Sequence, residues 1–153
     1  MTESPAPRDR CGPTASDRLH TIAGIALEAG SLVRGKLRSY RVDEVTLKGP
    51  RDYQTEADLA SERLIVEAVN RHFPNYAIWG EEQVGNRSAA SDAPRVLIDP
   101  IDGTTNFTWG IPHFGIVISI EEQGRIVLGA VYDPMQDELF TAEKGGGAWL
   151  NDR

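Results

Sequence analysis

The chain has 153 residues, of which 40% are hydrophobic and 25% charged, and its formal net charge is −7. This length suffices for one domain with a buried core and is too short for two large ones. The sequence contains no apolar run of membrane-spanning length and no signal-peptide pattern, so a cytoplasmic protein is expected. Binding to a nucleic-acid backbone needs clustered Lys and Arg, and the acidic balance disfavours that class of partner.

A disordered leader is predicted over the first fifteen residues, because prolines recur there without apolar periodicity. Pro5, Pro7 and Pro13 lie in this stretch. The single cysteine, Cys11, lies there too, and it has no second cysteine with which to form an internal disulfide. The rest of the chain, residues 16–153, is predicted to form one domain.

Two long helices are predicted in the first half of the chain. Apolar residues recur at helical spacing over about residues 17–38, where Ser16 is a suitable N-cap. Two glycines within this helix indicate close packing against another element. The second helix is predicted over about residues 56–73, and the sequence from Thr55 to Asp58 is typical of a capping box at its start.

Strands dominate the second half. Short apolar runs at 76–80 and 95–98 are predicted strands, and three more are expected at about 115–121, 125–132 and 138–143. The last three are separated by turn sequences and predict an antiparallel meander. Because helices come first and strands mostly follow, the predicted fold class is α+β, with two long helices packed on a mainly antiparallel sheet.

The stretch from residue 99 to 107, with the sequence DPIDGTTNF, says most about chemistry. Asp99 and Asp102 are separated by two residues at the end of a predicted strand, and Gly103 precedes two hydroxyl side chains. Mg²⁺ usually takes one or two carboxylates plus water and phosphate oxygens, and backbone N–H groups after a glycine can hold a phosphate. Asp-Pro and Asp-Gly are also common in ordinary solvated turns, so both interpretations stand at this point.

Two more acidic residues could join this motif. Glu81 follows one predicted strand just as Asp99 follows the next, and their carboxylates converge if those strands are neighbours in one sheet. Three carboxylates in one place repel each other unless cations lie among them, which predicts Mg²⁺. Asp58 could orient the hydroxyl of Thr104, or it could serve only as a helix cap. The alternative for Glu81 is an exposed loop glutamate.

The order of these motifs resembles that of the inositol monophosphatase family. The matching segments are TEAD at 55–58, WGEE at 79–82, IDPIDGTTNF at 98–107, GIPHF at 110–114 and YDP at 132–134. The resemblance covers nearly all of the chain from about residue 17 onward. It implies the N-terminal part of a layered α/β/α/β/α sugar-phosphatase fold. It also implies a magnesium-dependent, lithium-sensitive enzyme that acts as a homodimer in its full-length form.

The resemblance also implies a role for particular residues. Glu81, Asp99 and the main-chain carbonyl of Ile101 would bind a first Mg²⁺ ion. Asp99 and Asp102 would bridge to a second ion, and Glu81 would hold a third ion that carries more water. The reaction implied is an in-line displacement at phosphorus by a metal-activated water.

The remaining implied roles concern the attacking water and the phosphate. Asp58 and Thr104 would orient the water, and Gly103, Thr104 and Thr105 would cradle the phosphate. The implied substrate is a phosphate monoester of inositol or of a related polyol or sugar. Asn106 and Phe107 after the double threonine favour the inositol branch.

Length separates this chain from the family pattern. Family members are roughly twice as long, on the scale of a layered α/β phosphatase. Their second half supplies another aspartate to the second metal and most of the alcohol-recognition surface. Residues 16–153 are therefore expected to be an N-terminal domain truncated before the C-terminal one. The alternative hypothesis is a non-catalytic truncated chain that binds metal or a partner chain without turnover.

Overall fold

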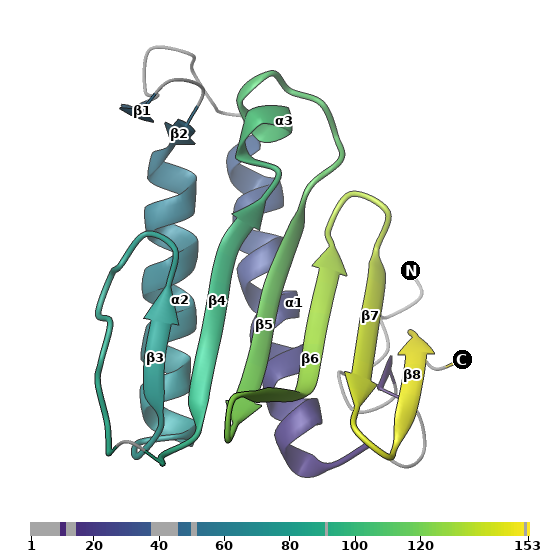
Figure 1. The fold of residues 1–153 in the computed structure, drawn as a ribbon. Helices are drawn as coiled ribbons and strands as arrows, with labels where there is room; N and C mark the ends of the chain where they lie inside the picture. Colours follow the sequence, from purple (N-terminus) through teal and green to yellow (C-terminus); the bar gives the residue numbers. More distant parts are fainter. Residues whose placement is uncertain (1–9, 12–14, 38–45, 50–51, 91, 152) are drawn as a thin grey trace.

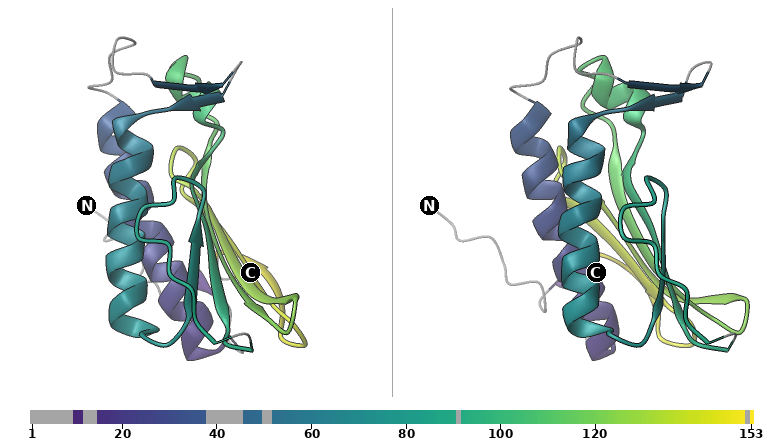
Figure 2. Two further views of the ribbon diagram at one scale, coloured as in Figure 1. Left: turned by 60° about the vertical axis from the view of Figure 1, so that its left-hand side comes forward. Right: turned by 90° about the vertical axis from the view of Figure 1, so that its left-hand side faces the viewer.

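The computed structural model describes residues 10–11, 15–37, 46–49, 52–90, 92–151 and 153. Two long helices, α1 and α2, run in opposite directions over one face of a six-stranded sheet, and a small two-stranded sheet lies beyond one end of them (Figures 1 and 2). The helices are α1 (Asp17–Leu37), α2 (Glu56–His72) and the short α3 (Thr104–Thr108). None of them combines the length and hydropathy of a membrane-spanning segment.

The large sheet has the strand order β3-β4-β5-β6-β7-β8, and the small one pairs β1 with β2. Their bounds are β1 (Thr46–Gly49), β2 (Asp52–Gln54), β3 (Ala77–Gly80), β4 (Arg95–Asp102), β5 (Gly115–Glu122), β6 (Arg125–Asp133), β7 (Glu138–Glu143) and β8 (Gly147–Leu150). Among the strands of the described residues, only β3 and β4 run parallel, and every other neighbouring pair is antiparallel. The predicted α+β class and the meander are confirmed.

Both predicted long helices are confirmed, together with their start signals. Ser16 caps α1, since its Oγ accepts a hydrogen bond of 3.3 Å from the Leu19 N–H. At the start of α2, the Asp58 carboxylate accepts a hydrogen bond of 2.8 Å from the Thr55 N–H. Thr55 Oγ1 in turn accepts from the Asp58 N–H, which completes the predicted capping box. The helices therefore begin where local hydrogen bonding dictates.

The core lies between the two helices and the inner face of the sheet. Alternate residues of the strands point inward and are buried, as period-2 alternation requires. They include Val96, Ile98, Ile116, Ile118, Ile120, Leu128, Ala130 and Leu139. In α1, a Cβ at Gly30 would lie 2.4 Å from Cδ1 of Tyr132. The expected close packing of this helix is therefore found at Gly30, where it crosses β6.

Four features differ from the sequence expectations. The strand predicted at 95–98 continues through the acidic motif to Asp102, because β5 pairs with it as far as Gly115. The short strand β2, the short helix α3 and the last strand β8 were not predicted. The four residues of β8 form a hairpin with β7. The first of them, Gly147, is the last of three consecutive glycines.

The predicted leader also differs where the structure describes it. Arg10 and Cys11 are buried, and the guanidinium of Arg10 donates a hydrogen bond of 2.8 Å to Asp137 and one of 3.2 Å to the side chain of Asn151. The same guanidinium lies 5.7 Å from the ring centroid of Tyr132. These contacts order the backbone at residues 10 and 11. Residues 1–9 and 12–14 of the predicted leader lie outside the described residues.

A pair of glycine substitutions in α1 tests this packing. Gly30→Ala should destabilise the fold by about 1–3 kcal/mol, because the buried Tyr132 ring is held by a hydrogen bond to Asp137 and cannot easily move away. Gly35→Ala should stabilise it by about 0.5–1 kcal/mol, because a Cβ there meets open space and alanine is the better helix former. Urea unfolding followed by circular dichroism measures both. Equal effects would contradict the close packing.

Thiol labelling tests the order of residues 10 and 11. Burial raises the pKa of Cys11 to about 11, so the thiol stays protonated in the folded chain at pH 8. A disulfide reagent should therefore react slowly with folded protein and much faster in denaturant. Because the folded pKa lies above the usual value of 9.0, this group's contribution to stability should fall as the pH rises from 9 towards 11. Equal labelling rates in both states would show that the segment is not packed.

Candidate active site

The site is built where β3 ends beside the parallel strand β4. β3 and β4 are neighbours, with Gly80 opposite Ile98, and the N–H of Glu81 donates a hydrogen bond of 3.0 Å to the carbonyl of Ile98. Glu81 therefore follows β3 immediately beside the point where Asp99 continues β4. The two strands are thus neighbours in one sheet, which is the arrangement under which the carboxylates of Glu81 and Asp99 were expected to converge.

The carboxyl group of Asp99 interacts electrostatically with the side chains of Glu81 and Asp102. Its half-buried position, the neighbouring Glu81 and then the charge of Asp102 raise its pKa to about 8, against a hydrogen bond of 3.2 Å from the Ile101 N–H that acts in the opposite direction. A carboxyl group with such a pKa keeps its proton at neutral pH unless a positive charge compensates. This concentration of negative charge is the electrostatic setting that favours a bound cation.

The oxygen atoms at this site are of the kind that bind a hard divalent cation, although they are not already arranged around an ion. Carboxylates and a main-chain carbonyl are the oxygen ligands that Mg²⁺ accepts. Across the residues that the structure describes, no group of three or more His, Cys, Asp or Glu side chains is already arranged to hold a metal ion. Glu81 and Asp102 are both exposed, so their side chains have room to turn towards an ion beside Asp99.

The hydroxyl of Thr104 links the acidic loop to α2. Its Oγ1 lies 3.1 Å from Oδ1 of Asp58 and 3.0 Å from the carbonyl oxygen of Ile101, and its one proton can be donated to either acceptor. Asp58 is buried and its other oxygen accepts from Thr55. Asp58 thus does both things that the sequence left open: it caps its helix and it contacts Thr104.

Burial is also what sets the protonation of Asp58. Loss of water around the carboxylate raises its pKa, and the hydrogen bonds from Thr55 and Thr104 oppose that rise. Each donor stabilises the charged form of the group. The donors therefore hold the carboxylate in one orientation, while burial keeps its pKa above the ordinary value.

The loop after Asp102 is fixed from the side of β5. Gly103 has a φ of 97°, in the left-handed region, and a Cβ there would lie 3.3 Å from the carbonyl oxygen of His113. That carbonyl also accepts a hydrogen bond of 2.7 Å from the side chain of Asn106. The rings of Phe107 and Phe114 pack edge to face, with centroids 5.4 Å apart. Gly103 thereby leads into α3, whose first N–H groups have no acceptor within the helix.

Two polar residues of α2 that hold the site together were missed in the sequence. Glu62 is fully buried, and its carboxylate accepts hydrogen bonds of 2.7 Å from the N–H groups of Glu82 and Val84. Ser61 donates a hydrogen bond of 2.9 Å to the carbonyl of Pro100. With Asp58 they lie three and four residues apart, on one face of the helix. That spacing of polar residues on a helix face that must be buried was the available signal.

The contact between Glu62 and β3 can be tested by mutation. A Cβ at Gly80 would lie 2.2 Å from Oε1 of Glu62, so Gly80→Ala should push the carboxylate off the N–H groups of Glu82 and Val84. We expect a loss of about 1–3 kcal/mol in the free energy of unfolding. Hydrogen exchange at those two amides should accelerate as well.

Glu62→Gln is the matched comparison, because it keeps the side-chain volume and one of the two acceptors. It should speed exchange at one of the two amides more than at the other. Unchanged exchange at both amides in both variants would refute the bracing role of Glu62.

Known proteins are related to this chain in sequence and in structure. The model of the "Inositol monophosphatase family" matches residues 16–153. An inositol-1-monophosphatase of Rhizobium meliloti is 51% identical over 136 residues, which cover 88% of this chain and 50% of the relative. The Nus factor SuhB of Escherichia coli K12 is 36% identical over 87% of this chain and 51% of its own length.

Solved structures agree with this relationship. The extragenic suppressor protein suhB of Bartonella henselae superposes with a TM-score of 0.84 at 38% identity, over 90% of this chain and 53% of the other. An IMPase of Thermotoga maritima gives a TM-score of 0.81 at 36% identity, over 90% and 52%. The chain therefore spans about half the length of these relatives. On this match of sequence, fold and motif order, the chain belongs to the inositol monophosphatase family.

Proposed function

We propose that this chain forms the N-terminal part of a Mg²⁺-dependent phosphatase that hydrolyses a phosphate monoester of inositol or of a related polyol or sugar. One observation carries the proposal: Glu81 directly follows β3 beside Asp99 in the adjacent parallel strand β4, and the Asp58–Thr104 hydrogen bond joins α2 to the start of α3. Membership of the family supports a phosphatase as the class of protein. The precise substrate, the metal and their ligands are part of the proposal.

The metal ligands would come from one short stretch and its neighbour. The carboxylates of Glu81, Asp99 and Asp102 and the carbonyl of Ile101 would hold two or three Mg²⁺ ions, with Glu81 shared by the one richest in water. When bound, such ions lower the pKa of a bound water, shield the phosphoryl oxygens and stabilise the leaving alkoxide. Positive charge beside Asp99 would also remove the cause of its raised pKa.

The attacking water would be oriented by Thr104. When its hydroxyl donates a hydrogen bond to Oδ1 of Asp58, the lone pairs of Oγ1 can accept a hydrogen bond from a water. The Asp58 carboxylate is buried and held by Thr55, so it fixes the direction in which the hydroxyl points. Thr104 and Asp58 would therefore position the nucleophile beside the carboxylates, with Glu81 on the open side of the site.

The phosphate would lie on the backbone after Asp102. Gly103, Thr104 and Thr105 present successive N–H groups where α3 begins, and the Asn106 contact to His113 holds that backbone in place. Donors that are fixed before the substrate arrives lose little freedom when charge develops on the phosphoryl oxygens.

The relatives supply the context for the rest of the proposal. Since the chain matches one half of each of them, the remaining ligand of the second metal and the surface that recognises the alcohol would come from a second half. A homodimer and a cytoplasmic location are likewise proposed for the full-length form. Several relatives are named Nus factor SuhB. Because of that name, the second candidate is the non-catalytic alternative, in which the chain binds a partner without turnover.

The activity can be tested in a chimera that continues this chain after Arg153 with the second half of the Rhizobium meliloti relative. It should release phosphate from a panel of inositol and polyol monophosphates only when Mg²⁺ is added. The 153-residue chain alone should show weak or no release, because it lacks the proposed second-half ligand. Robust turnover by the chain alone would refute that dependence.

Asp102→Asn in the chimera tests the proposed ligand. It should abolish Mg²⁺-dependent release, because an amide cannot replace the charge of the carboxylate that would hold the ion. Asp92→Asn, in the exposed loop between β3 and β4, is the matched control and should keep full activity. Undiminished turnover in Asp102→Asn would contradict the assignment.

A further inference from the structure

The first described residues of the chain contact the hairpin that β7 forms with β8. Arg10 and Cys11 lie beside these two strands (Figure 1). The family model matches residues 16–153, so both residues precede the matched part of the chain. Cys11 is nonetheless fully buried and belongs to the hydrophobic core. This packing is therefore a feature that the chain adds to the part it has in common with the family model.

Arg10 anchors this segment to both ends of the hairpin. Its Nη1 donates a hydrogen bond of 2.8 Å to the carboxylate of Asp137, and its Nη2 donates one of 2.6 Å to the carbonyl of the same residue. Nε and Nη2 also donate bonds of 3.2 and 2.5 Å to Oδ1 of Asn151. A buried guanidinium is stable only where acceptors match its donors, and these two residues supply them. Arg10 thus connects the turn before β7 to the residue that follows β8.

Asn151 extends this connection into β7 itself. The oxygen that accepts from Arg10 also accepts a hydrogen bond of 3.1 Å from the N–H of Leu139. The N–H of Asn151 in turn donates one of 2.7 Å to the carbonyl of Leu139, whose side chain is fully buried. Arg10 therefore orients the side chain that holds the start of β7 against the end of β8.

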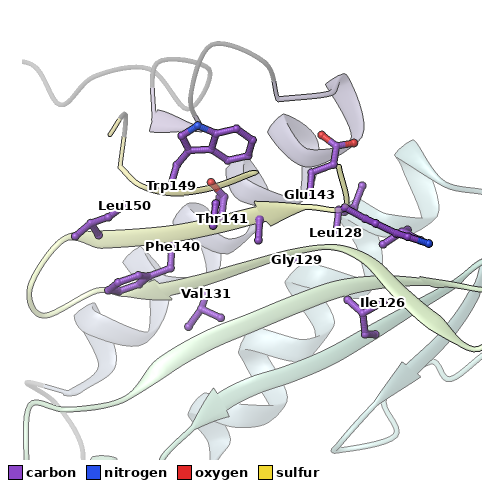
Figure 3. Close-up of a pocket in the computed structure, with 13 residues that line it drawn as sticks. Ile126, Leu128, Gly129, Val131, Phe140, Thr141, Glu143, Trp149 and Leu150 are labelled. Carbon is purple, nitrogen blue, oxygen red and sulfur yellow. The ribbon is translucent and has the colours of Figure 1, made fainter. Parts of the chain in front are cut away.

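Ser16 is a second anchor at the other end of β7. Its N–H donates a hydrogen bond of 2.9 Å to the carboxylate of Glu143, the last residue of β7. Glu143 and Thr141 point to one side of the hairpin, and Phe140 points to the other (Figure 3). Arg10 and Asp137 are 127 positions apart in the sequence, and so are Ser16 and Glu143. The two anchors therefore follow β7 in the same direction, one at each end of the strand.

The hairpin is the part of the sheet that most needs such anchors. In the described residues β8 is an edge strand with β7 as its neighbour, whereas α1 packs on β5, β6 and β7 and α2 packs on β4. Edge elements with few packed neighbours are the parts of a protein that open most easily. Hydrogen bonds from the start of the chain oppose that opening, because both strands of the hairpin are held by them.

We propose that Arg10 and Ser16 are the two anchors of an N-terminal strap that keeps the β7–β8 hairpin closed. Freeing either anchor lets this hairpin open as a local unit, while β3, β4 and the candidate active site stay folded. The strap is a conformational device that does not depend on the proposed function, since β7 and β8 lie at the opposite end of the strand order from β3 and β4.

Hydrogen exchange in the isotope-labelled 153-residue chain tests the strap. Arg10→Ala should accelerate exchange at the amides of Leu139 and Asn151 about tenfold, because the hydrogen bonds of a charged group are lost. The amides of Glu82 and Val84, which report on the turn after β3, should keep their rates. Unchanged exchange at Leu139 would overturn the proposal. Equal acceleration at all four amides would overturn it too, because the opening would then be global.

Two further variants control for the loss of charge. Arg18→Ala removes a guanidinium that binds Glu122 and Tyr76, away from the hairpin, and should leave exchange at Leu139 unchanged. Arg10→Lys keeps the positive charge but loses the planar fork that reaches both acceptors, so exchange at Leu139 should rise by only about threefold. Arg10→Lys also decides the matter if Arg10→Ala does not fold, since an unchanged rate would overturn the proposal.

The second anchor shows whether the two contacts act as one strap. Glu143→Ala leaves the N–H of Ser16 without this acceptor and should accelerate exchange at Leu139. If either change already releases the hairpin, the double variant should exchange hardly faster than Arg10→Ala alone. Effects that multiply, to about a hundredfold in the double variant, would show two independent contacts and overturn the strap.

Discussion

The parallel pairing of β3 with β4 is the interaction on which the rest of the site depends. It is the one parallel pair that the described part of the large sheet contains, and it brings Glu81 beside Asp99 although 17 residues of chain separate them. The pairing is stabilised from the helix layer: the buried carboxylate of Glu62 binds the turn after β3, and Ser61 binds the carbonyl of Pro100 in β4. A helix thus fixes the two strand ends relative to each other.

The same helix connects the acidic loop to its own first turn. Asp58 is a capping residue whose second oxygen reaches Thr104, so helix initiation and the placement of a site hydroxyl depend on one carboxylate. Buried polar groups of this kind are stable only when each donor and acceptor is matched. The described contacts of Asp58 and Glu62 meet that requirement, which explains why a helix facing the core carries two buried acidic residues.

The sequence predicted the elements whose signals are local. Periodicity and a capping box sufficed for α1 and α2, and alternation with turn residues sufficed for the meander. The short α3 has five residues, too few to show a helical period. The strand β8 begins within a run of glycines, which are typical of a turn and obscure the strand pattern. Arg10 contacts residues that lie 127 and 141 positions away along the sequence, and no local sequence pattern predicts such contacts. Glutamate is usually a surface residue, so the contacts of Glu62 with the turn after β3 become evident only from its burial in the structure.

The proposed function requires that the carboxylates of Glu81, Asp99 and Asp102 gather divalent cations at one place. Paramagnetic broadening by Mn²⁺, a substitute for Mg²⁺ with the same preference for oxygen ligands, tests it directly in the isotope-labelled 153-residue chain. Low Mn²⁺ should broaden amide signals first around Glu81 and from Asp99 to Thr104, and excess Mg²⁺ should restore them. Broadening spread evenly over exposed carboxylates, or centred elsewhere, would contradict it.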